Sequence, residues 1–276
     1  GTAPGCIIED GPVRVVMLPG PPRECVTMLR NYVMPYLQKL SGAVIRSHMI
    51  RFFGIGESSM ETRLRSFMDG ANPTVAPYSR EGECWVTAKG ANEQDCEALM
   101  EPVIEDICDK MGDLVYGIDC ASLEERVLQL LQEKNTSLAV AESCTGGLLA
   151  QRITDIPGAS AHFLGGVVTY TEDAKVRLLD MDEDLIAENG VVSMPVAAKM
   201  AKRVRKALGS DIGIGITGWA GPDGDDVGLV FVALASRSGC FVRRLQCGHA
   251  PRPRIRLIAA SNALDMIRRY LTGLDV

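Results

Sequence analysis

Short apolar strands alternate with helical stretches from Ser137 onward, and this alternation limits the fold more than any other feature of the chain. The strands are expected at 137–141, 163–169 and 212–217, and the helices at 146–153, 172–179, 195–208 and 253–271. Two more strands, 227–236 and 240–247, flank a Ser238-Gly239 turn and predict a hairpin. The pattern is typical of an α/β layered domain, and the hairpin indicates that its sheet is mixed.

The first forty residues have a different character. A strand is expected at 13–18, and apolar residues at helical spacing predict a helix over 23–40 that Pro35 interrupts. Because the chain opens on Gly1 and a turn-like segment, residues 1–40 are interpreted as the last part of a domain whose start is absent.

A second region, 41–117, has the expected order β-α-β-β-α, with boundaries at Ser41-Gly42 and after Tyr116. The third region is 118–276. Its first helix is expected to begin after Ser122, because Glu125 three residues later completes a capping box.

Composition excludes several classes of partner. The 276 residues contain 29 Lys and Arg against 35 Asp and Glu, a net charge of −6, whereas a general binder of phosphate backbones needs the opposite balance. Nucleic acid is therefore not an expected partner. No apolar run approaches the roughly 20 residues that span a bilayer, and no secretory signal opens the chain, so no membrane partner is expected.

Nine cysteines and three histidines bear on redox state and metals. No pair of cysteines has C-x-x-C spacing, the number is odd, and the chain is too large to need disulfides. Reduced thiols in the cytoplasm are the expected state. The histidines are not paired at metal-ligand spacing, so no metal site and no cofactor are expected.

Hydroxyl groups and glycines follow three of the expected strands where each strand ends. These segments are Glu142–Gly147, Thr169–Thr171 and Thr217–Pro222. Ligands of open α/β sheets bind at the carboxyl ends of strands. The sequence therefore predicts one crevice for a small polar ligand and favours a phosphorylated one.

Ser143 stands between an expected buried strand and a Gly-Gly helix start. Free backbone N–H groups and the helix dipole can hold an oxyanion or a phosphate at such a point. Ser143 could be a nucleophile. It could equally be a plain helix N-cap, as could Thr145. Cys144 is the rival nucleophile, but no histidine lies near it in sequence, and a core position explains it better.

A serine nucleophile needs a base, and with so few histidines Lys175 is the candidate, as in known Ser–Lys pairs. This lysine acts only when neutral, so burial or a neighbouring cation must lower its pKa. Tyr170 precedes it by one strand-to-helix turn and could relay the proton or orient the substrate. By spacing alone, a solvated Lys175 and a half-buried Tyr170 are the preferred interpretation.

Arginines gather where the last helix is expected to begin. Arg252, Arg254 and Arg256 lead into it, and in an acidic protein such a cluster favours a phosphate or carboxylate contact. Because neighbouring side chains point in different directions, most of the cluster is expected to be solvated. The glycines of 215–224 permit a ligand to approach the backbone closely, although plain turns have them too.

Four motifs together resemble the C-terminal domain of the CinA (competence/damage-inducible protein) family. They are Ala141–Gly147, Gly166–Tyr170 with Ala174-Lys175, Gly190–Ser193 and Gly215–Pro222, and they run in order between 123 and 271. Residues 1–5 and 18–22 resemble the end of that family's MoaB-like domain, and 44–116 its small KH-type domain. The expected architecture is an α/β/α layered sandwich with a mixed sheet, preceded by a small α+β KH-type domain.

The resemblance also implies an activity, which is hydrolysis of the carboxamide of nicotinamide mononucleotide to nicotinate mononucleotide and ammonia. It implies Ser143 as nucleophile, Lys175 as its base and Tyr170 as an assisting group, in a homodimer. The substrate contacts that it implies are Thr145, Gly146, Gly147, Thr217, Gly218, Arg252 and Arg256.

Other functions stay open. One is an adaptor or sensor in competence and the DNA-damage response that binds the nucleotide without turnover. The family's ADP-ribose pyrophosphatase activity is not expected, because it needs the whole MoaB-like domain. RNA binding is not expected of the KH-type region either, since acidic residues outnumber basic ones there and Gly54–Glu57 is not a G-x-x-G backbone clamp of the usual kind.

Overall fold

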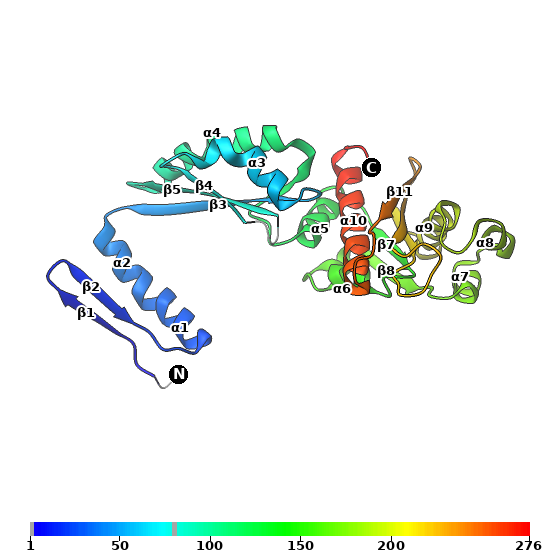
Figure 1. Cartoon of the computed structure of the whole chain (residues 1–276), viewed down its shortest axis with the longest axis horizontal. Helices are drawn as coiled ribbons and strands as arrows, with labels where there is room; N and C mark the ends of the chain where they lie inside the picture. The colour runs from blue at the N-terminus through cyan, green and yellow to red at the C-terminus, as the bar shows by residue number, and fades with distance from the viewer. Residues whose placement is uncertain (1–2, 79–81) are drawn as a thin grey trace. The chain divides into compact units, whose positions relative to one another are not determined.

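The computed structural model describes residues 3–78 and 82–276, and the chain divides into two compact units, Gly1–Val115 and Tyr116–Val276 (Figure 1). Each unit is described by itself below. Gly1 and Thr2, part of the first motif compared with the MoaB-like domain, lie outside the described residues.

The first unit opens on a hairpin followed by a helical segment. Strands β1 (Cys6–Asp10) and β2 (Val13–Met17) pair antiparallel. Helices α1 (Pro22–Met28) and α2 (Met34–Ser41) are joined by a π-helical turn, in which the Met34 N–H donates to the Leu29 carbonyl. The predicted interruption is therefore confirmed. Pro35 has no N–H to donate, and the wider turn lies just before it.

A four-stranded sheet with two helices on one face follows, and its last strand in the sequence crosses the boundary between the two units (Figure 1). The strand order is β4-β5-β3-β6. The bounds are β3 (Val44–Phe52), α3 (Glu57–Met68), β4 (Thr74–Tyr78), β5 (Glu83–Gly90), α4 (Glu93–Met111) and β6 (Val115–Ile118). Ile50, Leu64, Val86 and Met100 are buried between the sheet and the helices. The predicted β-α-β-β-α order is present, and β6 is a strand that the sequence did not predict, because four residues are too few to show alternation.

The second unit contains a five-stranded mixed sheet, as predicted. The strand order is β11-β10-β9-β7-β8, in which β8, β7 and β9 are parallel and β10 and β11 are antiparallel. The bounds are β7 (Leu138–Glu142), β8 (Phe163–Val168), β9 (Ile212–Gly218), β10 (Leu229–Ala235) and β11 (Cys240–Gln246). The carboxyl ends of the three parallel strands consequently meet at one edge.

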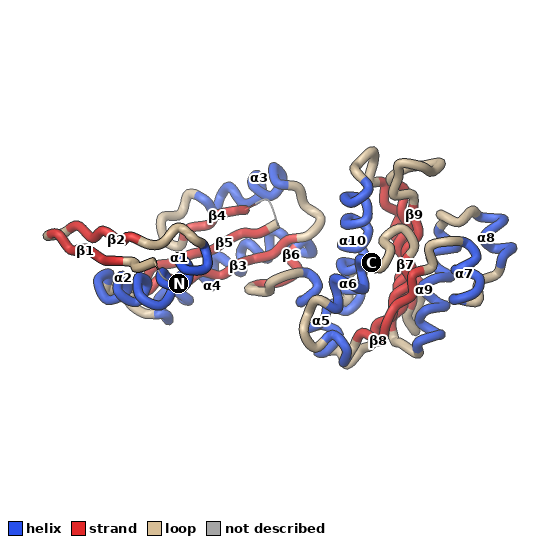
Figure 2. Tube along the Cα trace, turned by 90° about the horizontal axis from the view of Figure 1, so that it is seen from below, coloured by secondary structure: helices blue, strands red, loops and turns tan. Residues whose placement is uncertain are grey.

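Helices cover both faces of this sheet and make three layers (Figure 2). One face carries α5 (Leu123–Glu133), α6 (Leu148–Thr154) and α10 (Arg252–Thr272), and the other carries α7 (Glu172–Leu179), α8 (Glu183–Asn189) and α9 (Met194–Leu208). The predicted start of α5 is confirmed, since the Ser122 hydroxyl accepts from the Glu125 N–H at 3.2 Å. The Glu125 carboxylate in turn accepts from the N–H of Ala121, one residue before the N-cap. Ser193 occupies the N-cap of α9, but its hydroxyl donates to the Gly190 carbonyl instead of capping the helix.

Two glycines of β9 let α9 lie unusually close to the sheet. A Cβ atom at Gly213 would stand 2.2 Å from the Ala201 carbonyl oxygen, and one at Gly215 would stand 2.4 Å from the Ala197 carbonyl oxygen. Only glycine permits that approach. None of the helices within the described ranges combines the length and the apolar character that crossing a bilayer requires.

Candidate active site

A cavity of about 370 Å³ lies at the carboxyl ends of β7, β8 and β9. Ser143 follows β7, Tyr170 follows β8, and Thr217 and Gly218 end β9. Arg252, the first residue of α10, completes the group of predicted site residues in its lining. The structure therefore brings together five residues that the sequence analysis took from separate motifs.

Ser143 and Lys175 are in contact inside the protein. The Lys175 Nζ atom lies 3.1 Å from the Ser143 Oγ atom and 2.9 Å from the Thr169 carbonyl oxygen. Ser143 is 7% exposed and Lys175 is fully buried. Local sequence places the lysine there, because the Thr171 hydroxyl accepts from the Ala174 N–H and so starts α7 one turn before the lysine side chain.

Burial changes the acid–base behaviour of Lys175. Loss of solvation lowers its pKa from 10.5 to about 8, against smaller opposing effects of Cys144 and Glu172. With a pKa of about 8, roughly one lysine in ten is neutral at pH 7. An amine of this kind is available as a base, whereas an ordinary surface lysine is not.

The two hydrogen bonds also orient the amine. A neutral Lys175 has two N–H donors and one lone pair. If one N–H stays on the Thr169 carbonyl, the lone pair can turn toward Ser143 and accept the hydroxyl proton. The contact between Nζ and Oγ then reverses its direction without movement of either residue.

Cys144, the rival nucleophile, is chemically unsuited to the role. It lines the cavity but is only 5% exposed. Burial raises the pKa of its thiol to about 12, so almost none of it is thiolate near neutral pH. The hydroxyl of Ser143, by contrast, has the Lys175 amine beside it, which supports the preference for Ser143 over Cys144.

Tyr170 and Arg252 form a second pair at the open side of the cavity. An Arg252 Nη2 hydrogen bond to the Tyr170 hydroxyl measures 2.6 Å, and Nη1 donates to the Gly221 carbonyl at 2.5 Å. Tyr170 is 56% exposed. Within residues 3–78 and 82–276 the guanidinium has no carboxylate partner, so its charge is free to attract an anion.

The turn after Ser143 is closed by the protein itself. The Gly146 N–H donates to the Ser143 carbonyl, and the Gly147 N–H donates to the Glu142 carboxylate at 3.1 Å. Arg256 donates to the Thr145 carbonyl at 2.6 Å. The N–H groups of Gly146 and Gly147, which the sequence analysis took to be open, are thus occupied. Thr145, Gly146, Gly147 and Arg256 are not among the residues that line the cavity.

Thr217 connects two of the motifs. Its hydroxyl donates to the Val191 carbonyl at 2.8 Å, and Val191 and Val192 lie in the cavity lining. The 190–193 segment is thereby held at the end of β9. Trp219 also lines the cavity, and its ring lies against Gly224, where a Cβ atom would stand 2.7 Å from the ring.

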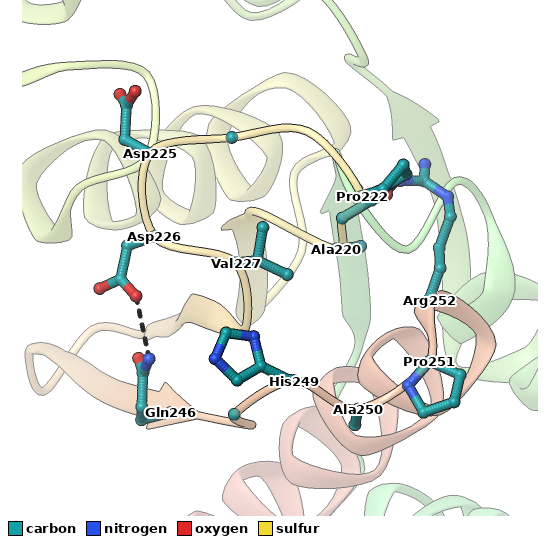
Figure 3. Close-up of a pocket in the computed structure, with 13 residues that line it drawn as sticks. Ala220, Pro222, Asp225, Asp226, Val227, Gln246, His249, Ala250, Pro251 and Arg252 are labelled. Carbon is teal, nitrogen blue, oxygen red and sulfur yellow. Dashed lines mark hydrogen bonds between the residues drawn. The ribbon is translucent and has the colours of Figure 1, made fainter.

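A second chamber of about 660 Å³ adjoins this cavity (Figure 3). Ala220, Gly221, Pro222 and Arg252 line both spaces. Asp226 accepts a hydrogen bond from Gln246 at 3.0 Å across the chamber, and His249 also lines it. Arg252 therefore stands at the boundary between the two spaces. In the described part of the chain, no three His, Cys, Asp or Glu side chains are grouped to hold a metal ion.

Known families match both parts of the chain. The family model of the CinA C-terminal domain matches residues 120–271, and that of the damage-inducible protein CinA KH domain matches residues 47–117. The chain belongs to the CinA family. The family predicted from the four motifs is therefore confirmed.

Relatives and solved structures agree with this assignment. A CinA-like protein of Desulfovibrio desulfuricans is 49% identical over 285 residues, covering 100% of this chain and 67% of that protein. A CinA-like protein of Dictyoglomus thermophilum is 42% identical over 281 residues, covering 99% of this chain and 68% of that protein. The chain thus spans about two thirds of the length of these relatives.

Two crystal structures resemble part of the chain. The competence/damage inducible protein CihA from Agrobacterium tumefaciens is 34% identical, with a TM-score of 0.52 over 54% of this chain and 93% of that chain. A CinA superfamily protein from Klebsiella pneumoniae is 28% identical, with a TM-score of 0.53 over 55% of this chain and 96% of that chain.

Proposed function

We propose that this chain is a serine-dependent amidohydrolase that converts nicotinamide mononucleotide to nicotinate mononucleotide and ammonia. The observation that carries the proposal is the contact between Ser143 Oγ and Lys175 Nζ at 3.1 Å, with the lysine fully buried and its pKa lowered to about 8. A hydroxyl next to a neutral amine is the arrangement that Ser–Lys hydrolases use.

The first half of the proposed reaction forms an acyl-enzyme. Neutral Lys175 accepts the proton of the Ser143 hydroxyl while Oγ attacks the carboxamide carbon. The protonated Lys175 then gives its proton to the departing nitrogen, which leaves as ammonia. The product of this half is a nicotinoyl ester on Ser143.

The second half repeats the same proton transfers with water. Lys175, neutral again, takes a proton from a water molecule, which attacks the ester carbonyl. Lys175 returns that proton to Ser143 as the ester bond breaks, and nicotinate mononucleotide leaves. One water is consumed, and no redox change or metal-bound group is required by the balance.

Arg252 is the proposed contact for the phosphate of the substrate. It lines the same cavity as Ser143, it is exposed, and in the described part of the chain its guanidinium donates to neutral acceptors only. Arg256 has the weaker case, because it is not among the residues that line this cavity. Thr217 and Gly218, which share the cavity lining, remain the proposed contacts for the rest of the nucleotide.

Ammonia release from nicotinamide mononucleotide, measured without added metal, tests the proposal. We expect turnover by the wild-type chain and loss of turnover in Ser143→Ala and in Lys175→Ala. Full activity in both variants contradicts the mechanism. Binding of the mononucleotide without ammonia release contradicts the enzymatic function and favours a sensor or adaptor. The homodimer and the cytoplasmic location stay predictions.

A further inference from the structure

We propose that Glu142 is a positioning residue for the nucleophile, acting through the backbone of the turn that carries Ser143. Its carboxylate is 1% exposed and accepts three backbone hydrogen bonds. Oε2 accepts from the Gly147 N–H and the Leu149 N–H, both at 3.1 Å, and Oε1 accepts from the Ala150 N–H at 2.8 Å. The inference rests on the proposed function, because it assigns Ser143 the role of nucleophile.

The hydrogen bond from the Gly147 N–H to the Glu142 carboxylate closes a ring that includes the main chain of Ser143. Between Glu142 and Gly147 lie only Ser143 to Gly146, so the side-chain bond fixes both ends of this short segment. The segment needs that support, because Gly146 and Gly147 have the positive φ angles of 58° and 91°. Without a fixed end, a turn of two glycines has many conformations, and most of them move the Ser143 hydroxyl.

The backbone of Glu142 is tied to the residue that orients the base. Its carbonyl accepts from the Thr169 N–H at 2.8 Å, and the Thr169 carbonyl accepts from Lys175 Nζ at 2.9 Å. The Ser143 N–H donates to the Ile216 carbonyl at 3.0 Å. Hydrogen bonds of the neighbouring strands thus fix the Ser143 N–H and the carbonyl that orients Lys175, while the Glu142 side chain holds the far end of the turn at Gly147.

The effect of Glu142 is geometric rather than electrostatic. Burial is the main cause of the lowered pKa of Lys175, and a substitution of equal volume at Glu142 should leave that burial in place. We therefore expect the pKa of the base to stay lowered in such a variant. What changes is the placement of Ser143, and a displacement on the order of 1 Å at a reacting atom costs about 10²-fold in rate.

Glutamine cannot replace this carboxylate fully. Both carboxylate oxygens accept, whereas a glutamine amide has one accepting oxygen and one NH₂ group that donates. In Glu142→Gln that NH₂ group must face at least one of the three N–H donors. The substitution keeps the volume of the side chain and removes part of the ring closure.

The test compares Glu142→Gln with Glu124→Gln. Glu124 is a matched control, because its carboxylate is also largely shielded, binds Arg152 of α6 at 2.5 Å and does not line the cavity. For Glu142→Gln we expect kcat to fall about 10²-fold, KM to stay within about twofold, and the pH inflection of kcat/KM to stay in place. Glu124→Gln should lose melting temperature but keep kcat within about twofold.

A second readout separates this inference from the choice of substrate. A fluorophosphonate probe reports the reactivity of Ser143 directly and needs no nicotinamide nucleotide; Ser143→Ala supplies the blank. We expect slower labelling of Glu142→Gln than of wild type, and the same ranking whether or not ammonia is released. If the probe labels wild type but no ammonia is released, the proposed substrate is wrong. The labelling rates of wild type and Glu142→Gln still decide the role of Glu142.

Glu142→Asp covers the case in which Glu142→Gln does not fold. Aspartate keeps the charge but is shorter by one methylene, so we expect a folded protein with reduced kcat and reduced labelling. Wild-type kcat and wild-type labelling in either folded variant overturn the inference. So does an equal loss of kcat in Glu124→Gln, because it makes the effect a general consequence of instability.

Discussion

The two ends of the candidate active site use opposite environments for their cations. At the inner end, Lys175 is fully buried, and desolvation lowers its pKa to about 8. At the outer end, Arg252 is exposed, and its guanidinium donates to the Tyr170 hydroxyl and the Gly221 carbonyl. Burial makes a base of one cation, and exposure leaves the other ready to attract an anion.

This contrast assigns separate tasks to residues that share one small cavity. In the proposed function, Ser143 and Lys175 carry out the chemistry, and Arg252 binds the anionic part of the substrate. Tyr170 lies with the recognition end, since its hydroxyl accepts from Arg252 and no hydrogen bond joins it to Ser143 or Lys175 in the described parts of the chain. Substitutions at each end should therefore have different kinetic signatures.

The largest effect is expected at the inner end, in Lys175→Met. Loss of the general base should lower kcat by about 10²- to 10⁴-fold with the substrate still bound. Lys206→Met, which removes an exposed lysine of α9, is the matched control and should keep wild-type kcat. Steady-state ammonia release measures both. If Lys175→Met keeps more than a third of the wild-type kcat, Lys175 is not the general base, and the two ends of the cavity do not have separate tasks.

The same variant should be more stable than wild type at neutral pH. A lysine whose pKa falls from 10.5 to about 8 on folding binds fewer protons in the folded state than in the unfolded state between those values. Its cost is full below pH 8 and disappears as the pH rises above 10.5. We expect Lys175→Met to add about 1–3 kcal/mol at pH 7, measured by urea unfolding. If the difference in unfolding free energy between Lys175→Met and wild type is the same at pH 7 and at pH 10.5, the buried amine does not titrate as described.

Arg252→Met tests the outer end. Loss of a charge-assisted phosphate contact should lower kcat/KM for the mononucleotide by about 10- to 100-fold, mostly through KM. Nicotinamide riboside, which has no phosphate, should be hydrolysed equally by variant and wild type. Arg254→Met is the control, because Arg254 is exposed in the same segment and does not line the cavity. An equal loss for both substrates assigns Arg252 to the chemistry instead.

Tyr170→Phe should have the smallest effect. It removes the hydroxyl that Arg252 holds but keeps the ring, and one such hydrogen bond is worth about 1 kcal/mol, or roughly fivefold. We expect that change in KM, with kcat near wild type. A fall in kcat of more than about 10²-fold makes Tyr170 a proton relay and moves it to the inner end.

Local signals predicted most of the fold. The Ser122–Glu125 capping box and the start of α7 after Thr171 gave helix starts that the structure reproduces. Strand β6 and helix α8 were missed, because four and seven residues carry too little periodicity, and β6 owes its pairing to a strand far away in sequence.

The site was harder to predict because its properties depend on contacts across the fold. The hydroxyl-bearing strand ends identified Ser143 and Tyr170, but spacing alone preferred a solvated Lys175, which is in fact fully buried. Glu142 was read only as the end of a strand. Nothing in the sequence indicated that its carboxylate would occupy the N–H groups assumed to be open for substrate.

The pH dependence of kcat/KM in the wild-type chain tests the central claim most directly. If neutral Lys175 is the base, kcat/KM for the mononucleotide rises about tenfold per pH unit below an inflection near pH 8 and is level above it. Stability controls at each pH exclude unfolding as the cause. A profile that is flat between pH 6 and 9, or an inflection at the ordinary lysine value of 10.5, contradicts the account.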